Sequence, residues 1–187
     1  MAVMALASLT DAPGWPPRVA VGAALVLVWS GRLLAHLWSR VIGRPEDPRY
    51  ARLRVQWGKP SDVFFLTFFL GQGALAILLS LPLVITRMNT RTEFSSWEWI
   101  GLVLWLAALS GEWISDMQLR RFKASPGNKG RTCRSGLWKY SRHPNYFFEW
   151  LCWCAYPVIA IDLGGFNPYG WFAVLAPLCM YWLLTSV

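Results

Sequence analysis

The segment VFFLTFFLGQGALAILLSLPLVI runs from Val63 to Ile85 without one charged side chain. A helix crosses a bilayer with about 20 consecutive, mostly apolar residues, so this stretch predicts a membrane span. Four further segments have a similar length and character: Val19–Trp38, Trp97–Ser115, Tyr146–Leu163 and Tyr169–Val187. We therefore expect an all-α, polytopic membrane bundle of about five transmembrane helices, forming a single domain over residues 1–187.

The composition agrees with this class, because 55% of the 187 residues are apolar and thirteen are tryptophan.

The net charge of +8 is typical either of nucleic-acid binding or of the cytoplasmic loops of a membrane protein. The four loops between the five predicted spans carry six, two, eight and no Lys or Arg residues. This alternation excludes a nucleic-acid patch. It predicts an N-terminus outside and loops 39–62 and 116–145 in the cytoplasm.

Metal chemistry is not expected. The four cysteines form no C-x-x-C pair, and only two histidines could complete a ligand set.

Three spans carry polar residues at the same end and at helical spacing. Residues four apart share a helix face, and charges within a span usually face a bundle interior or a wet cavity. The three stripes are Arg32, His36 and Arg40; Glu112, Asp116 and Arg120; and Asn145, Glu149 and Trp153. Snorkelling arginines and structural ion pairs would explain any one stripe. All three at one depth favour a shared cavity open to the cytoplasm.

The ligand of such a cavity follows from its lining. Basic residues of the third loop suit phosphate groups, and the deeper carboxylates and asparagine suit amide, ribose or adenine groups. We therefore expect a nucleotide cofactor, with an anionic lipid headgroup as the competing interpretation.

The motif Arg142-His143-Pro144-Asn145 lies where the ligand would enter. Proline fits the first turn of a helix, so the span should begin at Pro144 with Arg142 beside its positive end. Asn145 and Glu149 then point into the pocket, one turn apart. His143 could exchange a proton or cap the helix.

Two blocks of the chain also resemble a known family. QLRRFKASPGNKGRTCRSGLWKYSRHPNYFFEW, Gln118–Trp150, resembles the signature of bacterial membrane proteins of the steroid 5-alpha-reductase superfamily, in a branch described only as a domain of unknown function. GRLLAHLWSRVIGRPEDPRYARLRVQWG, Gly31–Gly58, resembles an earlier block of that branch. The shorter RHPNY-x-x-E element is similar to one in the isoprenylcysteine carboxyl methyltransferases, which bind S-adenosylmethionine.

The resemblance implies an enzyme that binds NADPH in a cytoplasm-facing cavity, formed mostly by the C-terminal half, about residues 97–187. Matched by position or motif, the expected cofactor contacts are Arg32, Glu112, Asp116, Arg120, Lys123, Arg131, Tyr140, Arg142, Asn145, Glu149 and Trp153, with His143 as a neighbour. Glu149, Asn145 and His143 are the expected catalytic residues. Trp29 stands where the superfamily places a substrate-side tyrosine, and the superfamily's glutamate has no counterpart here. We therefore expect a truncated or shortened relative, located in a bacterial inner membrane as the resemblance implies, that acts on a steroid-like or other enone substrate.

The sequence thus favours NADPH-dependent reduction of an activated C=C bond in a lipophilic small molecule. Two alternatives stay open: an S-adenosylmethionine-dependent membrane methyltransferase, and a non-enzymatic lipid-binding protein whose charges anchor helix ends. The expected partners are the lipophilic substrate and membrane lipids.

Overall fold

The computed structural model describes residues 16–41, 43, 48–58, 61–89, 91–161, 167 and 169–186, and within them every regular element is a helix. The α-helices are α2 (Pro16–Val41), α3 (Pro48–Trp57), α4 (Ser61–Arg87), α5 (Ser96–Ala124), α6 (Pro144–Ile161) and α7 (Leu175–Thr185). Short 3₁₀ helices are η1 (Pro126–Asn128), η2 (Gly136–Lys139) and η3 (Gly170–Val174). The all-α prediction is confirmed.

Three helices are long and apolar enough to cross a membrane: Pro17–Ala35 within α2, Asp62–Arg87 in α4 and Ser96–Ala124 in α5. The chain is therefore an integral membrane protein by length and composition. The fourth predicted span corresponds to α6. Among the described residues, α6 is not one of the helices that are both long and apolar enough to cross a membrane. The fifth is shorter than predicted, because its first turns form η3 and its α-helix holds 11 residues. Three of the five predicted spans are thus shown.

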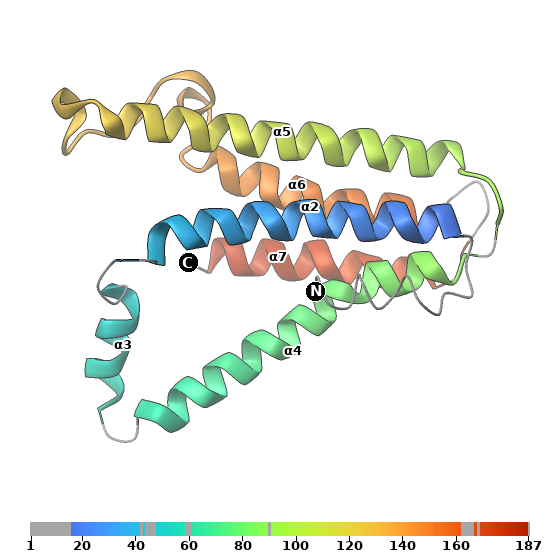
Figure 1. Cartoon of the computed structure of the whole chain (residues 1–187), viewed down its shortest axis with the longest axis horizontal. Helices are drawn as coiled ribbons and strands as arrows, with labels where there is room; N and C mark the ends of the chain where they lie inside the picture. Colours follow the sequence, from blue (N-terminus) through green and yellow to red (C-terminus); the bar gives the residue numbers. More distant parts are fainter. Residues whose placement is uncertain are drawn as a thin grey trace.

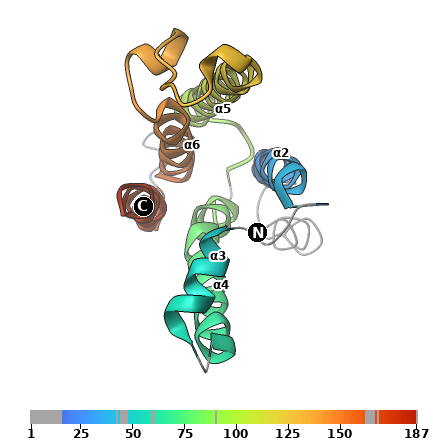
Figure 2. The same cartoon turned by 90° about the vertical axis from the view of Figure 1, so that its left-hand side faces the viewer.

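The helices form a bundle with one divergent member. Seen end-on in Figure 2, α5 and α6 lie together, α2 and α7 flank them, and α4 lies below. In Figure 1, α4 meets the bundle at its C-terminal end and leans away at its N-terminal end. The segment between α5 and α6 projects at the same end as the C-terminus of α2, which we call the loop end.

Small residues let α5 and α6 approach closely. A Cβ on Gly101 would lie 2.5 Å from Ile159 Cγ1, and one on Gly111 would lie 2.4 Å from Phe148 Cε1. Such distances do not occur between real atoms, so both positions need glycine. Around this contact lies the core, which includes Trp105, Ala108, Cys152, Ala155, Tyr156, Ala176 and Met180.

Helix α3 lies within the segment that the sequence analysis treated as a loop. It crosses the loop end beside α4 (Figure 1). Tyr50 packs on Phe65, Phe68 and Phe69 with ring centroids 6.3 to 6.4 Å apart, and Trp57 lies 5.0 Å from Phe65. Ten isolated residues would be marginal as a helix in water, so this aromatic contact with α4 stabilises α3.

The segment after α5 folds back onto that helix. Helix α5 continues nine residues beyond the predicted end at Ser115, to Ala124. Leu137 donates its backbone N–H to Gln118 Oε1 at 2.9 Å, and Trp138 Nε1 donates to the Ser115 carbonyl at 2.9 Å. Gly136 has a φ of +60°, and a Cβ there would lie 2.5 Å from Gln118. These contacts hold η2 against α5.

Candidate functional site

Arg32 of α2 joins acids from two other helices at the loop end. Its guanidinium contacts Glu112 of α5, lies 3.2 Å from Asp116 Oδ2 of α5, and lies 3.4 Å from Glu149 Oε2 of α6. We call these four residues the Arg32 cluster. The side chains of the three acids are only 6%, 15% and 13% exposed, so they face inward rather than toward lipid. It is thus confirmed that the three predicted stripes meet at these positions, whereas the shared cavity open to the cytoplasm stays a prediction.

Two tryptophans hold Glu149 in place. The indole N–H groups of Trp29 and Trp153 both donate to Glu149 Oε1 at 3.0 Å. The two rings meet edge to face, with centroids 5.3 Å apart. Because Glu149 also bonds Arg32 through its other oxygen, its side chain has one well-defined orientation. Trp29, predicted on the substrate side, thus stands in direct contact with the cluster.

The Arg32 cluster and the adjoining Asn145 contain buried polar atoms without partners. Within the described part of the chain, Arg32 Nε, Glu112 Oε2 and Asn145 Oδ1 are buried and make no hydrogen bond. Asn145 still donates from Nδ2 to Asp116 Oδ1 at 3.4 Å. Buried polar groups are almost always hydrogen-bonded in folded proteins. One open donor and two open acceptors at one place therefore suit a ligand that carries both kinds of group, such as a carboxamide.

A basic hollow of about 800 Å³ lies beside the start of α6. Its lining includes no acidic residue, so it suits a polyanion. The basic residues and the histidine that line it are Arg131, Arg134, Lys139, Arg142 and His143. A neighbouring hollow of about 390 Å³ shares Arg131 and adds Lys123 and Lys129.

The remaining predicted residues lie at the rim. Tyr140 lines the basic hollow and is 84% exposed. His143 is exposed, and its ring stacks on Tyr146 with centroids 5.0 Å apart. Arg120 is exposed and lines neither hollow. The side chains of His36 and Arg40, which belonged to the first predicted stripe, lie outside the described residues.

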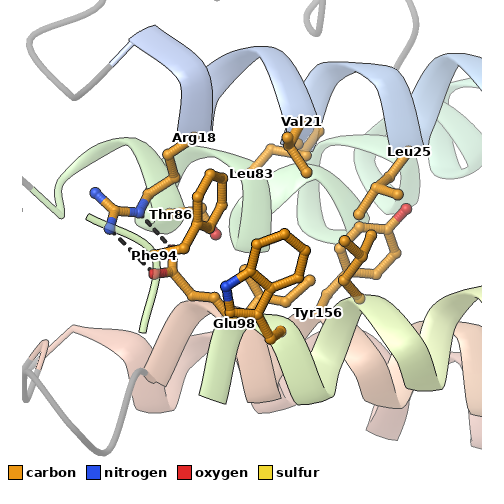
Figure 3. Close-up of a pocket in the computed structure, with 12 residues that line it drawn as sticks. Arg18, Val21, Leu25, Leu83, Thr86, Phe94, Glu98 and Tyr156 are labelled. Atoms are coloured by element: carbon orange, nitrogen blue, oxygen red, sulfur yellow. Dashed lines mark hydrogen bonds and ion pairs between the residues drawn. The ribbon is translucent and has the colours of Figure 1, made fainter. Parts of the chain in front are cut away.

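A second buried ion pair, Arg18–Glu98, lies at the opposite end and was not predicted (Figure 3). Arg18 donates Nε and Nη2 to Glu98 at 2.5 and 3.0 Å. It also donates to the carbonyls of Asn89, Arg91 and Glu93 at 3.1, 2.5 and 2.7 Å. All five N–H groups are thereby bonded, and both side chains are at most 1% exposed. Arg18 has no N–H left for a ligand, and Glu98 is buried against it, so we interpret the pair as structural.

A signal for this second pair does exist in the sequence. Ser95 and Glu98 form a capping box, in which Glu98 N–H bonds Ser95 Oγ at 3.2 Å and Ser95 N–H bonds Glu98 Oε2 at 2.9 Å. The S-x-x-E pattern marks the start of α5. The cavity beside the pair is small, about 60 Å³, and mostly apolar.

Comparison with known proteins gives a family and one informative relative. "Uncharacterized protein C594.04c" of Schizosaccharomyces pombe is 26% identical over 162 residues, which cover 74% of this chain and 47% of the relative. The chain thus spans about half the length of the curated relative that it matches. No solved structure matches the chain significantly. The family model described as "Protein of unknown function (DUF1295)" matches residues 1–187, so the chain belongs to the DUF1295 family, which is associated with the steroid 5-alpha-reductase-like superfamily.

Proposed function

We propose that this protein is an NADPH-dependent membrane reductase that transfers hydride to an activated C=C bond of a lipophilic, steroid-like or enone substrate. The proposal rests on two features that lie near each other at the loop end. A buried cluster with open hydrogen-bonding atoms, Arg32 with its three acids, occurs together with a basic hollow of about 800 Å³. A dinucleotide has the matching polarity, with an amide at one end and phosphates toward the other.

The residues present fit this cofactor. NADPH supplies the hydride when bound, and the protein supplies binding and orientation. Asn145 Oδ1 and Glu112 Oε2 can accept from the amide nitrogen of a nicotinamide, and Arg32 Nε can donate to its oxygen. Glu149, fixed by two indoles, orients Arg32. The proposed phosphate contacts are Lys123, Arg131, Tyr140 and Arg142, which line the two hollows; Arg120, expected among them from the sequence, lines neither.

The substrate side is proposed next to the tryptophan pair. Trp29 is half-buried beside the cluster and could contact a flat lipophilic molecule, whereas Trp153 is buried behind it, between Trp29 and Tyr156. In this scheme Asn145 and Glu149 hold the nicotinamide end of the cofactor. His143, at the exposed rim, exchanges a proton with water. Residues 39–62 and 116–145 would face the cytoplasm of a bacterial cell, since positively charged loops stay on that side.

One observation favours a second candidate, a methyltransferase that uses S-adenosylmethionine. The cluster holds three carboxylates and one guanidinium, an excess of negative charge that suits a sulfonium. The basic hollow argues against it, because S-adenosylmethionine carries no phosphate. A lipid-binding protein without catalytic activity is the third candidate.

Titration of the detergent-solubilised protein with NADPH, NADH and S-adenosylmethionine, followed by thermal unfolding, separates the candidates. A ligand present at 100 times its Kd stabilises the folded state by about 2.7 kcal/mol. We expect NADPH to raise Tm, and Arg142→Gln to weaken that rise. Stabilisation by S-adenosylmethionine alone would support the methyltransferase. No response to any of the three would leave the lipid-binding protein.

The Glu149→Gln variant gives a matched control, since it keeps the shape of the side chain and removes its charge. The Tm without ligand should fall as well, because a Gln side chain that accepts from both indoles turns its NH2 toward the Arg32 guanidinium. The NADPH-dependent rise is therefore measured from the variant's own ligand-free Tm, and we expect this rise to be smaller than in the wild type. An unaltered rise would refute the assignment of the cofactor to this cluster.

A further inference from the structure

A third hollow lies on the outer face of α5, away from the Arg32 cluster. It measures about 550 Å³ and lies between α5, α6 and η2. Along α5 its lining residues are Ala107, Ser110, Gly111, Ile114 and Gln118, which repeat at helical spacing and so form one stripe. From Ala107 to Gln118 the stripe extends roughly 16 Å at 1.5 Å per residue. We call this feature the α5 groove.

The α5 groove changes character along its length. Its part within the membrane span is lined by small or apolar residues, among them Gly111, Ile114 and Phe148. Its end at η2 is lined by Lys139 and Tyr140, both exposed. None of the lining residues is acidic. The groove is therefore apolar at hydrocarbon depth and cationic at headgroup depth.

The depth of the groove depends on Gly111. Phe148 packs directly on this glycine, where an added Cβ would lie 2.4 Å from the ring. The ring therefore lies against bare backbone and forms the floor, while Ala107 and Ser110 above it leave room along the helix surface. Exposed Leu106 and Ile114 show that this face of α5 is turned outward, toward the acyl chains of the bilayer.

We propose that the α5 groove binds one anionic phospholipid. Its phosphate would pair with the Lys139 ammonium and accept from the Tyr140 hydroxyl, while one acyl chain would lie along Ala107, Gly111 and Phe148. An ammonium without a neighbouring acid selects a negative headgroup over a zwitterionic one. An apolar channel of this length selects a lipid over free phosphate.

The argument for this site does not rest on the proposed reductase activity, but the two sites would share Tyr140. Lys139 and Tyr140 line both the α5 groove and the basic hollow. A bound headgroup would therefore lie between the α5 groove and the basic hollow. An anionic lipid there would add negative charge beside the basic hollow, so the lipid composition of the membrane would change the electrostatics of the cofactor region.

Native mass spectrometry can test the proposal. The full chain is reconstituted in nanodiscs that contain phosphatidylglycerol and phosphatidylcholine with identical acyl chains, and the lipids retained on release are counted. We expect one phosphatidylglycerol per protein to be retained preferentially. Lys139→Gln should weaken this retention about fivefold, as expected for one basic residue at a charged membrane surface.

Two further variants separate the parts of the site. Ala107→Phe fills the apolar part and should also reduce retention, although every charge remains. Lys129→Gln removes an equal charge from the neighbouring 390 Å³ hollow and should leave retention unchanged. Equal retention of both lipids by the wild type would overturn the proposal. So would an equal loss in the Lys129 and Lys139 variants, because it would indicate general attraction to the basic segment.

Discussion

Replacing Arg18 by methionine should destabilise the bundle strongly, since this arginine is buried and fully bonded. The substitution removes two hydrogen bonds to Glu98 and three to the carbonyls of Asn89, Arg91 and Glu93. Glu98 would stay 2% exposed, with the Ser95 N–H as a hydrogen-bond donor at 2.9 Å. Removing one partner of a buried ion pair costs about 3–5 kcal/mol, because an uncompensated charge remains. Exposed pairs contribute only about 0–1 kcal/mol.

A double-mutant cycle isolates the pair from the surrounding carbonyls. We would measure the free energy of unfolding by titration with sodium dodecyl sulfate in mixed micelles, using far-ultraviolet circular dichroism, for Arg18→Met, Glu98→Leu and the double variant. Because the double variant leaves no unpaired charge, it should lose clearly less stability than the two single variants together. The difference should be about 2 kcal/mol or more.

The reasoning would be refuted if Arg18→Met lost less than about 1 kcal/mol, the value of an exposed pair. It would also fail if the two single losses were simply additive. Arg18 lies roughly 21 Å from Arg32 along α2 at 1.5 Å per residue, so the variant should keep the NADPH response of the wild type if it folds. That response separates damage to the fold from damage to the site.

Three further substitutions test particular contacts by the same unfolding assay. Arg32→Lys keeps the charge but replaces two separated donor nitrogens, Nη1 and Nη2, by one, so we expect a loss of about 2 kcal/mol, and wild-type stability would contradict the bridging role. Trp29→Phe removes one of the two indole donors to Glu149 and should cost about 1.5 kcal/mol, the value of a hydrogen bond to a charged group. Gly111→Ala should cost about 1–3 kcal/mol, because the added methyl group overpacks against the Phe148 ring. Gly127→Ala is the control and should be nearly neutral, because no atom lies within 4 Å of the added Cβ.

The Arg32 cluster could be predicted from sequence because its signal is local. A charged residue within an apolar span is costly and therefore conspicuous, and spacing of four residues assigns it to a helix face. Arg32, Asp116 and Glu149 were found in this way. Their common depth at one end of three spans then predicted that they meet. The pairing partners and the role of the Trp29 indole were not predictable, because side-chain geometry depends on how the helices rotate against one another.

The features that were missed depend on contacts between distant segments. Arg18 stands just before the first apolar run and looks like an ordinary flanking charge, and its partner Glu98 lies 80 positions away. Only the capping box at Ser95 was readable locally. Helix α3 is too polar and too short to be recognised as a span, and it forms against aromatic rings that belong to α4. Both cases require knowledge of which helices become neighbours.

The Arg18–Glu98 pair also bears on how the bundle meets the membrane potential. In the part of the chain that the structure describes, this end holds a fully bonded arginine and a cavity of about 60 Å³ with mostly apolar walls. The larger polar hollows, by contrast, lie at the loop end. A charged ligand that enters and leaves from the loop end would not pass the Arg18 end, so its binding should depend little on the membrane potential.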